Sequence, residues 1–423
     1  MYQNLSKEEL SALKTTLEKE YEALKSKGLK LDMSRGKPCS EQLDLSNAMM
    51  TYDLGNFKTD VGFDCRNYGA LDGINEAKRL LMPMLGVEEE CVIVGGNSSL
   101  QLMYDMLAKA MLLGVAENAK PWVKCEKIKF LCPSPGYDRH FAILDAFGIE
   151  MLPVAVNADG PDMDTVEKLA AEDESIKGIF CVPMYSNPDG FTYSDETVRR
   201  FASMKTAVSD FRILWDNAYC VHHLTDTPDT LLNIYEECKK AGTEDRVYIF
   251  VSTSKISFAG GGISGFASSP KNVDFIRKQL SIQTISFERI NQLRHARFFK
   301  NMDGIAEHMK KHRDIIAPKF DAVNEMLDKK LTPNGLGEWN IPRGGYFISF
   351  NGLKGTAKRT VALCKEAGVV LTGAGATYPY GLDPDDKNIR IAPTFPPVDE
   401  LNSAMEIFCA SVKLASVEIL LAN

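Results

Sequence analysis

The chain has 423 residues, too many for one compact core, so we expect a large domain with a smaller one beside it. Its net charge of −8 excludes the clustered excess of basic residues that nucleic-acid binding needs, and no run of about 18 apolar residues predicts a membrane span. The ten cysteines lack paired spacing, which is typical of reduced thiols in a cytoplasmic protein.

The N-terminal segment predicts an amphipathic helix and not a secretion signal. It lacks an apolar core, and its leucines recur at helical spacing among Lys and Glu. Ser6 followed by Glu9 predicts a capping box at the start of this helix.

From about Cys91 onward, short apolar runs alternate with longer amphipathic ones. Such apolar strands separated by helices predict an α/β fold with a mostly parallel sheet covered on both faces. After about Ile290 the pattern changes to a long charged helix, two short strands and a final helix, which predicts a smaller α+β domain. We expect the large domain to comprise residues 46–305 and the small domain residues 1–45 with 306–423.

Ligands of such sheets bind beyond the carboxyl ends of the strands. Lys255 follows one apolar run among small residues, and a lysine whose head is desolvated suits imine formation; the alternative is a solvated lysine in a Gly-rich turn. Asp216 ends the apolar run RILWD, so its carboxylate needs a partner. The protonated pyridine nitrogen of pyridoxal 5′-phosphate (PLP) would be one, and the alternative is a helix cap.

The other strand ends offer weaker candidates. Asn97, Ser98 and Ser99 open a helix and suit a phosphate, although such residues are common at helix starts. Tyr219 and Asn187 would hydrogen-bond the phenolic oxygen of PLP, and Tyr137 would stack on its ring. The alternatives are an interfacial aromatic, a plain turn residue and a packing aromatic, respectively.

Arg390 lies between two isoleucines on a short late strand, and its guanidinium suits a bidentate carboxylate. The alternative is an edge-strand arginine in water. His308 and His312 are four residues apart on the long charged helix, among Lys310, Lys311 and Arg313. That pattern favours a solvated face over a metal ligand pair, so we expect no metal site.

Taken in order, these residues resemble the class I aminotransferases of PLP fold type I. The likeness extends from MSRGKP, which starts at Met33, to Arg390, and it includes Tyr68 in NYGALDG and Ser252 with Lys255. MSRGKP, CPSPGYDRH, STSKISFAGGG and NQLRH are similar to a divergent bacterial subgroup of aspartate aminotransferases. That subgroup is related to part of some transcription regulators, but about 30 residues before Met33 are too few for a helix-turn-helix.

The resemblance implies a seven-stranded type of sheet and a homodimer in which Tyr68 reaches the phosphate of the other subunit's cofactor. It implies PLP held as a Schiff base on Lys255, with Ser252 and Ser254 beside it, and ping-pong transfer of an amino group between an amino acid, which we expect to be aspartate, and 2-oxoglutarate. Gly36, Asn187 and Arg390 would lie at the substrate α-carboxylate.

The resemblance leaves substrate choice open. We predict that Arg139 and Arg35 hold a distal carboxylate, with Arg289 and Arg294 in reserve. The alternative is that the first two pair with Asp138 and Asp32. Most relatives place a phosphate-binding arginine eight residues after the lysine, where this chain has Ile263. Rival activities are transamination of aromatic amino acids, kynurenine or 2-aminoadipate, and a PLP-dependent β-lyase reaction.

Overall fold

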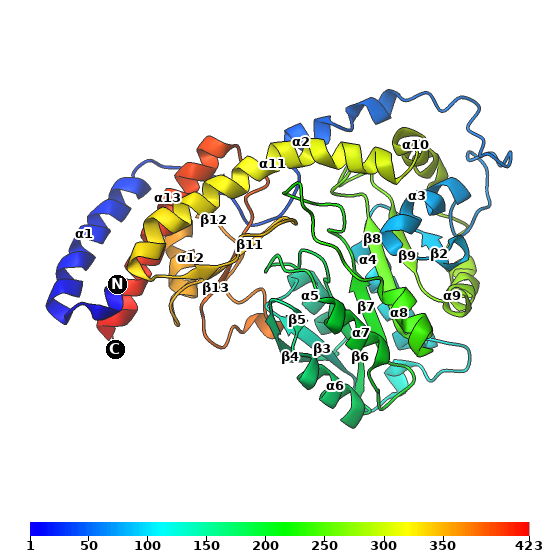
Figure 1. Ribbon diagram of the computed structural model, residues 1–423, viewed down its shortest axis with the longest axis horizontal. Helices are drawn as coiled ribbons and strands as arrows, with labels where there is room; N and C mark the ends of the chain where they lie inside the picture. The colour runs from blue at the N-terminus through cyan, green and yellow to red at the C-terminus, as the bar shows by residue number, and fades with distance from the viewer. Residues whose placement is uncertain (423) are drawn as a thin grey trace.

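An eight-stranded sheet forms the centre of the larger part of the molecule in the computed structural model, which describes residues 1–422 (Figure 1). The strand order is β2-β9-β8-β7-β6-β3-β4-β5. The strands are β2 (Val92–Val94), β3 (Lys129–Ser134), β4 (Glu150–Asn157), β5 (Gly160–Pro161), β6 (Ile176–Cys181), β7 (Arg212–Asp216), β8 (Val247–Ser252) and β9 (Ser264–Ala267).

Five neighbouring strands, in the order β8-β7-β6-β3-β4, pair in parallel, which confirms the predicted α/β fold. β9 runs antiparallel between β8 and β2. The sheet has one strand more than the seven expected, because the two-residue β5 folds back antiparallel on the end of β4.

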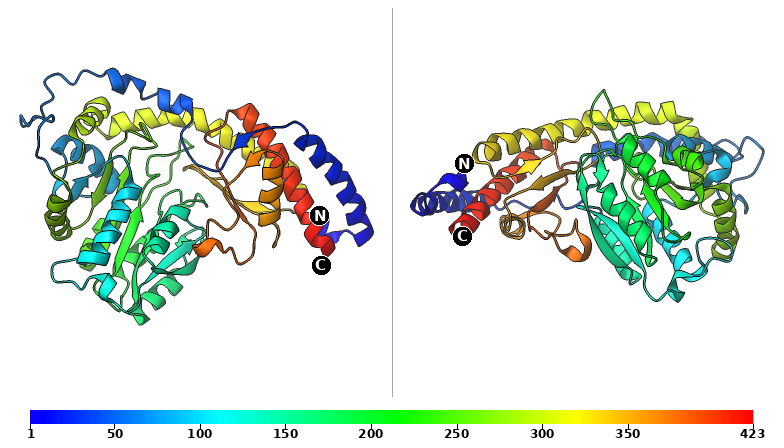
Figure 2. Two further views of the ribbon diagram at one scale, coloured as in Figure 1. Left: turned by 180° about the vertical axis from the view of Figure 1, so that it is seen from behind. Right: turned by 60° about the horizontal axis from the view of Figure 1, so that its bottom comes forward.

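Helices cover both faces of this sheet (Figures 1 and 2). Side chains alternate along a strand, so Ile213 and Trp215 of β7 pack into one apolar cluster and Leu214 into another. The first cluster includes α3 (Asn75–Leu85), α6 (Met163–Glu172), α7 (Asp195–Ser203) and α8 (Ile234–Ala241). The second includes α4 (Ser99–Leu113), α5 (Asp138–Ala146) and α9 (Pro270–Gln283).

The smaller part contains a three-stranded antiparallel sheet in the order β10-β11-β13 and a two-stranded parallel pair, β1 with β12. Both chain ends lie at this end of the molecule (Figure 2). Its elements are α1 (Lys7–Lys25), β1 (Leu31–Asp32), α2 (Ser40–Asp44), β10 (Glu338–Trp339), β11 (Ile348–Asn351), α12 (Ala357–Glu366), β12 (Val369–Val370), β13 (Asn388–Ile391) and α13 (Val398–Ala422). The predicted capping box of α1 is confirmed, because Ser6 N donates to Glu9 Oε2 over 2.7 Å and Glu9 N to Ser6 Oγ over 3.2 Å.

The charged segment after Ile290 forms two helices and not one. α10 (Arg289–Phe299) ends at Lys300, and α11 (Met302–Leu331) then runs for about 45 Å along both parts of the molecule. The prediction that His308 and His312 lie on a solvated face is wrong, since both side chains are buried. They pack toward α2 and the segment after Lys255, while the neighbouring lysines stay exposed.

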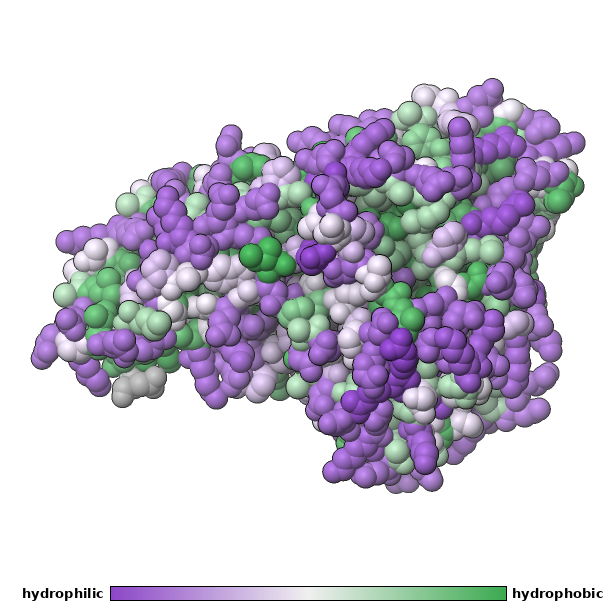
Figure 3. Space-filling model, viewed as in Figure 1, coloured by the Kyte–Doolittle hydropathy of each residue, from purple (hydrophilic) through white to green (hydrophobic). Residues whose placement is uncertain are grey.

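The surface in Figure 3 is mostly hydrophilic, with smaller apolar groups between. None of the helices in residues 1–422 is long and apolar enough to cross a membrane. All ten cysteines are free thiols, and eight of them are buried.

Candidate active site

A cavity of about 110 Å³ lies beyond the carboxyl ends of β6, β7 and β8. Eight of the predicted site residues line it together: Ser98, Ser99, Tyr137, Asn187, Asp216, Tyr219, Ser254 and Lys255. Parallel strands place their carboxyl ends at one edge of a sheet, and this brings residues up to 157 positions apart into one place. The individual roles of these residues stay predictions.

Lys255 follows β8 and is partly buried. Its Nζ lies 5.3 Å from the ring centroid of Tyr219 and 5.9 Å from that of Tyr346, and it has no ion-pair partner among residues 1–422. Burial lowers the pKa of Lys255, and the negative charge of Asp216 partly opposes this. This shift increases the fraction of Lys255 in the neutral form, which is the form that attacks a carbonyl or accepts a proton.

Asp216, at the end of β7, is 3% exposed and is held by a residue that the sequence analysis missed. Its Oδ2 is 3.1 Å from Nε2 of His140, a buried histidine whose ring stacks on Phe180. Oδ1 of Asp216 has no partner within residues 1–422. A buried carboxylate oxygen without a donor is costly, so this atom fits a cationic N–H that a bound group would supply.

Two tyrosines flank this carboxylate. Tyr219 is 4% exposed, and burial raises its pKa well above the usual value. Tyr137 is the N-cap residue of α5, and its pKa is raised to about 12, mainly by burial and then by the charge of Asp216. Both phenols are therefore protonated at neutral pH and can donate hydrogen bonds.

The start of α4 faces the same cavity. Ser98 is its N-cap residue but makes no side-chain capping bond, so it leaves the first N–H groups for an external acceptor. Ser252 Oγ lies 2.8 Å from Ser254 Oγ and 3.4 Å from the carbonyl oxygen of Asn97. The Asn97 side chain itself points away, donating to Ala259 O over 3.3 Å.

Arg390 on β13 approaches the cavity from the smaller part of the molecule. It is 5% exposed, so the alternative of an edge-strand arginine in water is wrong. Nη1 donates to Asp138 Oδ1 over 2.7 Å and to Asn187 Oδ1 over 3.2 Å, and the guanidinium carbon lies 4.7 Å from the ring centroid of Phe347. Gly36 covers that ring so closely that a Cβ there would lie 2.5 Å from Phe347 Cζ.

The predicted distal cations lie outside the cavity lining. Arg35 and Arg139 are both exposed. Within residues 1–422, neither pairs with the neighbouring aspartate that the alternative named: Asp138 binds Arg390, and Asp32 accepts from Ser34.

The two reserve arginines, Arg289 and Arg294, differ in whether their side chains are already bound. Arg289 donates to the carbonyl oxygens of Asn67 and Gly69 and to Ser286 Oγ. It therefore holds the turn that carries Tyr68, whose side chain is 75% exposed. Arg294 lines a second cavity of about 410 Å³, next to Gly96 and Asn97. Ile263 is buried in the apolar core, so position 263 offers no cation.

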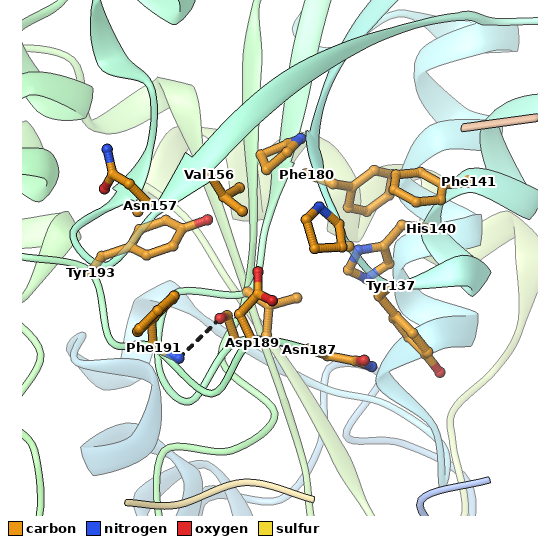
Figure 4. A pocket seen from close by; sticks show the side chains of 16 residues that line it. Tyr137, His140, Phe141, Val156, Asn157, Phe180, Asn187, Asp189, Phe191 and Tyr193 are labelled. Atoms are coloured by element: carbon orange, nitrogen blue, oxygen red, sulfur yellow. Dashed lines mark hydrogen bonds between the residues drawn. The ribbon is translucent and has the colours of Figure 1, made fainter. Parts of the chain in front are cut away.

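A cavity of about 30 Å³ adjoins the site and shares Tyr137 and Asn187 with its lining (Figure 4). That volume holds one or two waters at most. The carboxylate of Asp189 points into it and is 8% exposed. Burial raises the pKa of Asp189 to about 6. In the sequence the NPDG segment that contains Asp189 predicts only a turn, so no local pattern marks this residue.

A lysine of lowered pKa, an unpartnered buried carboxylate oxygen and an open helix start meet at the strand ends of an α/β sheet, an arrangement that indicates a cofactor-dependent enzyme. The family model for aspartate amino-transferase matches residues 5–423. An aspartate aminotransferase of Corynebacterium glutamicum is 44% identical over 98% of this chain and 96% of its own length. The chain therefore belongs to the aspartate aminotransferase family, and it is an aminotransferase.

Solved structures agree with this assignment. An aspartate transaminase from C. glutamicum has a TM-score of 0.96 and 44% identity, with 99% of each chain covered. An α-aminoadipate aminotransferase from Thermus thermophilus, complexed with N-(5′-phosphopyridoxyl)-L-leucine, has a TM-score of 0.73 and 18% identity over 93% of each chain, which shows the shared fold.

Proposed function

We propose that this aminotransferase uses PLP to move an amino group between L-aspartate and 2-oxoglutarate by a ping-pong mechanism, as a cytoplasmic homodimer. The observation that carries the proposal is the unpartnered Oδ1 of Asp216, in one cavity with the Nζ of Lys255. Aspartate is favoured because the C. glutamicum relative at 44% identity is named an aspartate aminotransferase.

The residues present fit this cofactor. Asp216 Oδ1 would accept from the protonated pyridine nitrogen, and His140 holds the other oxygen of the same carboxylate. Tyr219 and Asn187 would donate to the phenolic oxygen, and Tyr137 would lie against the ring. The phosphate would be met by the start of α4 with Ser98, Ser99, Ser252 and Ser254, and by Tyr68 of the partner subunit. Bound PLP supplies an electron sink that lowers the cost of removing the substrate Cα proton.

The side chains around the cavity would then have separate roles in the reaction. Lys255 Nζ would hold the cofactor covalently and would move the proton at the substrate Cα; burial lowers its pKa, which favours the proton-accepting form. Arg390 would hold the α-carboxylate, with Asn187 Oδ1 only 3.2 Å from its Nη1. We propose Arg139 and Arg35 for the distal carboxylate, since both are exposed and unpaired within residues 1–422 and so are free to turn inward.

Lys255 provides the first test. The purified protein should absorb visible light, and borohydride should attach the cofactor to Lys255. Lys255→Ala should still bind PLP but lose turnover by roughly three orders of magnitude or more, because the base is gone. Lys271→Ala, which removes an exposed lysine, is the matched control. A Lys255→Ala variant that turns over at nearly the parent rate would refute the assignment.

A panel of amino donors with 2-oxoglutarate tests the reaction and substrate. Aspartate should be the best donor, and alanine should be slower by roughly two orders of magnitude, because it has no distal carboxylate to pair. Release of pyruvate and ammonia without an acceptor would instead identify a β-lyase.

A further inference from the structure

Arg390 already holds a carboxylate that belongs to the chain. Its Nη1 donates to Asp138 Oδ1 over 2.7 Å, and its Nη2 to Thr372 Oγ1 over 3.3 Å. Nε is buried and has no partner within residues 1–422. Arg390 is also absent from the lining of the cavity that contains Lys255. A ligand carboxylate that reaches Arg390 therefore meets a guanidinium that is already paired with Asp138.

The two partners differ in their freedom to move. The side chain of Asp138 is 30% exposed, whereas that of Arg390 is 5% exposed and lies against Phe347. Asp138 is the first residue of α5, where the positive end of the helix stabilises a carboxylate that has left its partner. Asp138 can therefore rotate into water, while Arg390 stays in place.

The ion pair also joins the two parts of the molecule. Asp138 belongs to a helix on the eight-stranded sheet, and Arg390 to β13 of the three-stranded sheet, 252 residues further along the chain. Thr372, which also contacts Arg390, donates to the carbonyl oxygen of Ser34, two residues before the glycine that covers Phe347. Thr372 therefore links Arg390 to the segment that carries Ser34 and Gly36.

We propose that Asp138 is an intramolecular competitor for Arg390, standing where a substrate α-carboxylate must bind, and that it sets substrate affinity by having to be displaced. This rests on the proposed role of Arg390. The competition applies to the carboxylate that all substrates share, so it weakens binding of amino acids and oxo acids by one common factor. It leaves the preference between aspartate and alanine unchanged.

The test is Asp138→Asn in the PLP-loaded enzyme, which keeps shape and a carbonyl acceptor but removes the charge. Calorimetric titration with propionate, a single carboxylate without an amine, and with maleate should give a Kd lower than the parent's by roughly tenfold for both. The KM of aspartate and of 2-oxoglutarate should fall by a similar factor. Asp145→Asn removes an exposed charge from the same helix and should change nothing. Asp138→Ser, a second uncharged variant, should follow Asp138→Asn.

Arg390→Lys separates this proposal from the one on which it rests. If Arg390→Lys weakens propionate binding but neither Asp138 variant strengthens it, the competitor role is wrong and Arg390 keeps its place. A weaker Kd in both Asp138 variants means that Asp138 positions Arg390, which also overturns the proposal. If Arg390→Lys leaves the Kd and KM values unchanged, the carboxylate site itself lies elsewhere.

Discussion

Acidification from pH 7 to pH 5 should destabilise the folded protein through its buried histidines. Burial lowers the pKa of His295 and of His312 from 6.5 to about 4, and the neighbouring His308 adds to the effect on His312. A group whose pKa is lower in the folded state binds its proton mainly in the unfolded state as the pH falls. Its stabilising effect is therefore complete above pH 6.5 and is lost between pH 6.5 and pH 4.

The magnitude follows from these pKa values. Each of the two histidines lowers the free energy of unfolding by about 2 kcal/mol when the pH falls from 7 to 5. Asp189 acts in the opposite sense, because its pKa rises from 3.8 to about 6 on folding. Between pH 7 and pH 5 it therefore raises the free energy of unfolding by about 1 kcal/mol. His295, His312 and Asp189 together therefore give a net loss of about 3 kcal/mol. His222, His223 and His308 also have lowered pKa values, so they make the loss larger.

Urea unfolding of the PLP-loaded protein at fixed concentration, followed by circular dichroism at pH 7 and pH 5, measures this difference. His312→Gln removes one titrating ring and keeps a polar group beside Gln42, whose Nε2 lies 3.0 Å from His312 Nδ1. The variant should lose about 2 kcal/mol less than the parent over the same interval. The reasoning fails if parent and variant have the same pH dependence, or if the parent is equally stable at both pH values.

Further substitutions test the site by steady-state kinetics. Asp216→Ala should lower kcat by roughly two orders of magnitude or more and Asp216→Glu by less, since only the latter keeps a carboxylate for the pyridine nitrogen; equal activity of the Ala variant and the parent would mean that Asp216 is a structural cap. Arg390→Lys loses the planar fork and should reduce kcat/KM by about 2–4 kcal/mol for every amino donor, whereas a loss confined to dicarboxylic donors would place Arg390 at the distal end. Gly36→Ala should raise KM by an amount that corresponds to about 1–3 kcal/mol of binding free energy. The added Cβ would push the ring of Phe347 against Arg390, because the two lie in close contact. An unchanged KM would show that the ring has room to move.

The sequence predicted the main sheet and the assembly of the cavity because both follow from local patterns. Each apolar run is a strand, and the polar residues after it lie at the carboxyl edge, so Asn187, Asp216 and Lys255 converge on one cavity. The bounds of the two domains stay a prediction. The extra strand β5 was missed because two residues carry no periodicity to detect.

Contacts between distant segments could not be predicted in this way. Nothing near Asp138 in the sequence points to Arg390, 252 residues away, and nothing near His140 points to Asp216. The error at His308 and His312 has a different cause, because the signal was present. The two histidines continue the buried helical stripe of Ile316 and Phe320 at four-residue spacing, and the charged residues between them lie on the opposite, exposed face.

The isoleucine at position 263 determines how the proposed cofactor would be held. Its side chain is 2% exposed in the apolar core, and its N–H donates to Thr253 Oγ1 over 2.9 Å, so this position contributes to the packing of β9 and not to an anion site. The phosphate would then be met by neutral donors at the start of α4, where a helix end contributes roughly half a positive charge. Retention of PLP would therefore depend more on the two ends of its ring system, the covalent bond to Lys255 and the charged contact with Asp216. The Oδ1 of Asp216, which has no partner within residues 1–422, is the atom that this charged contact would use.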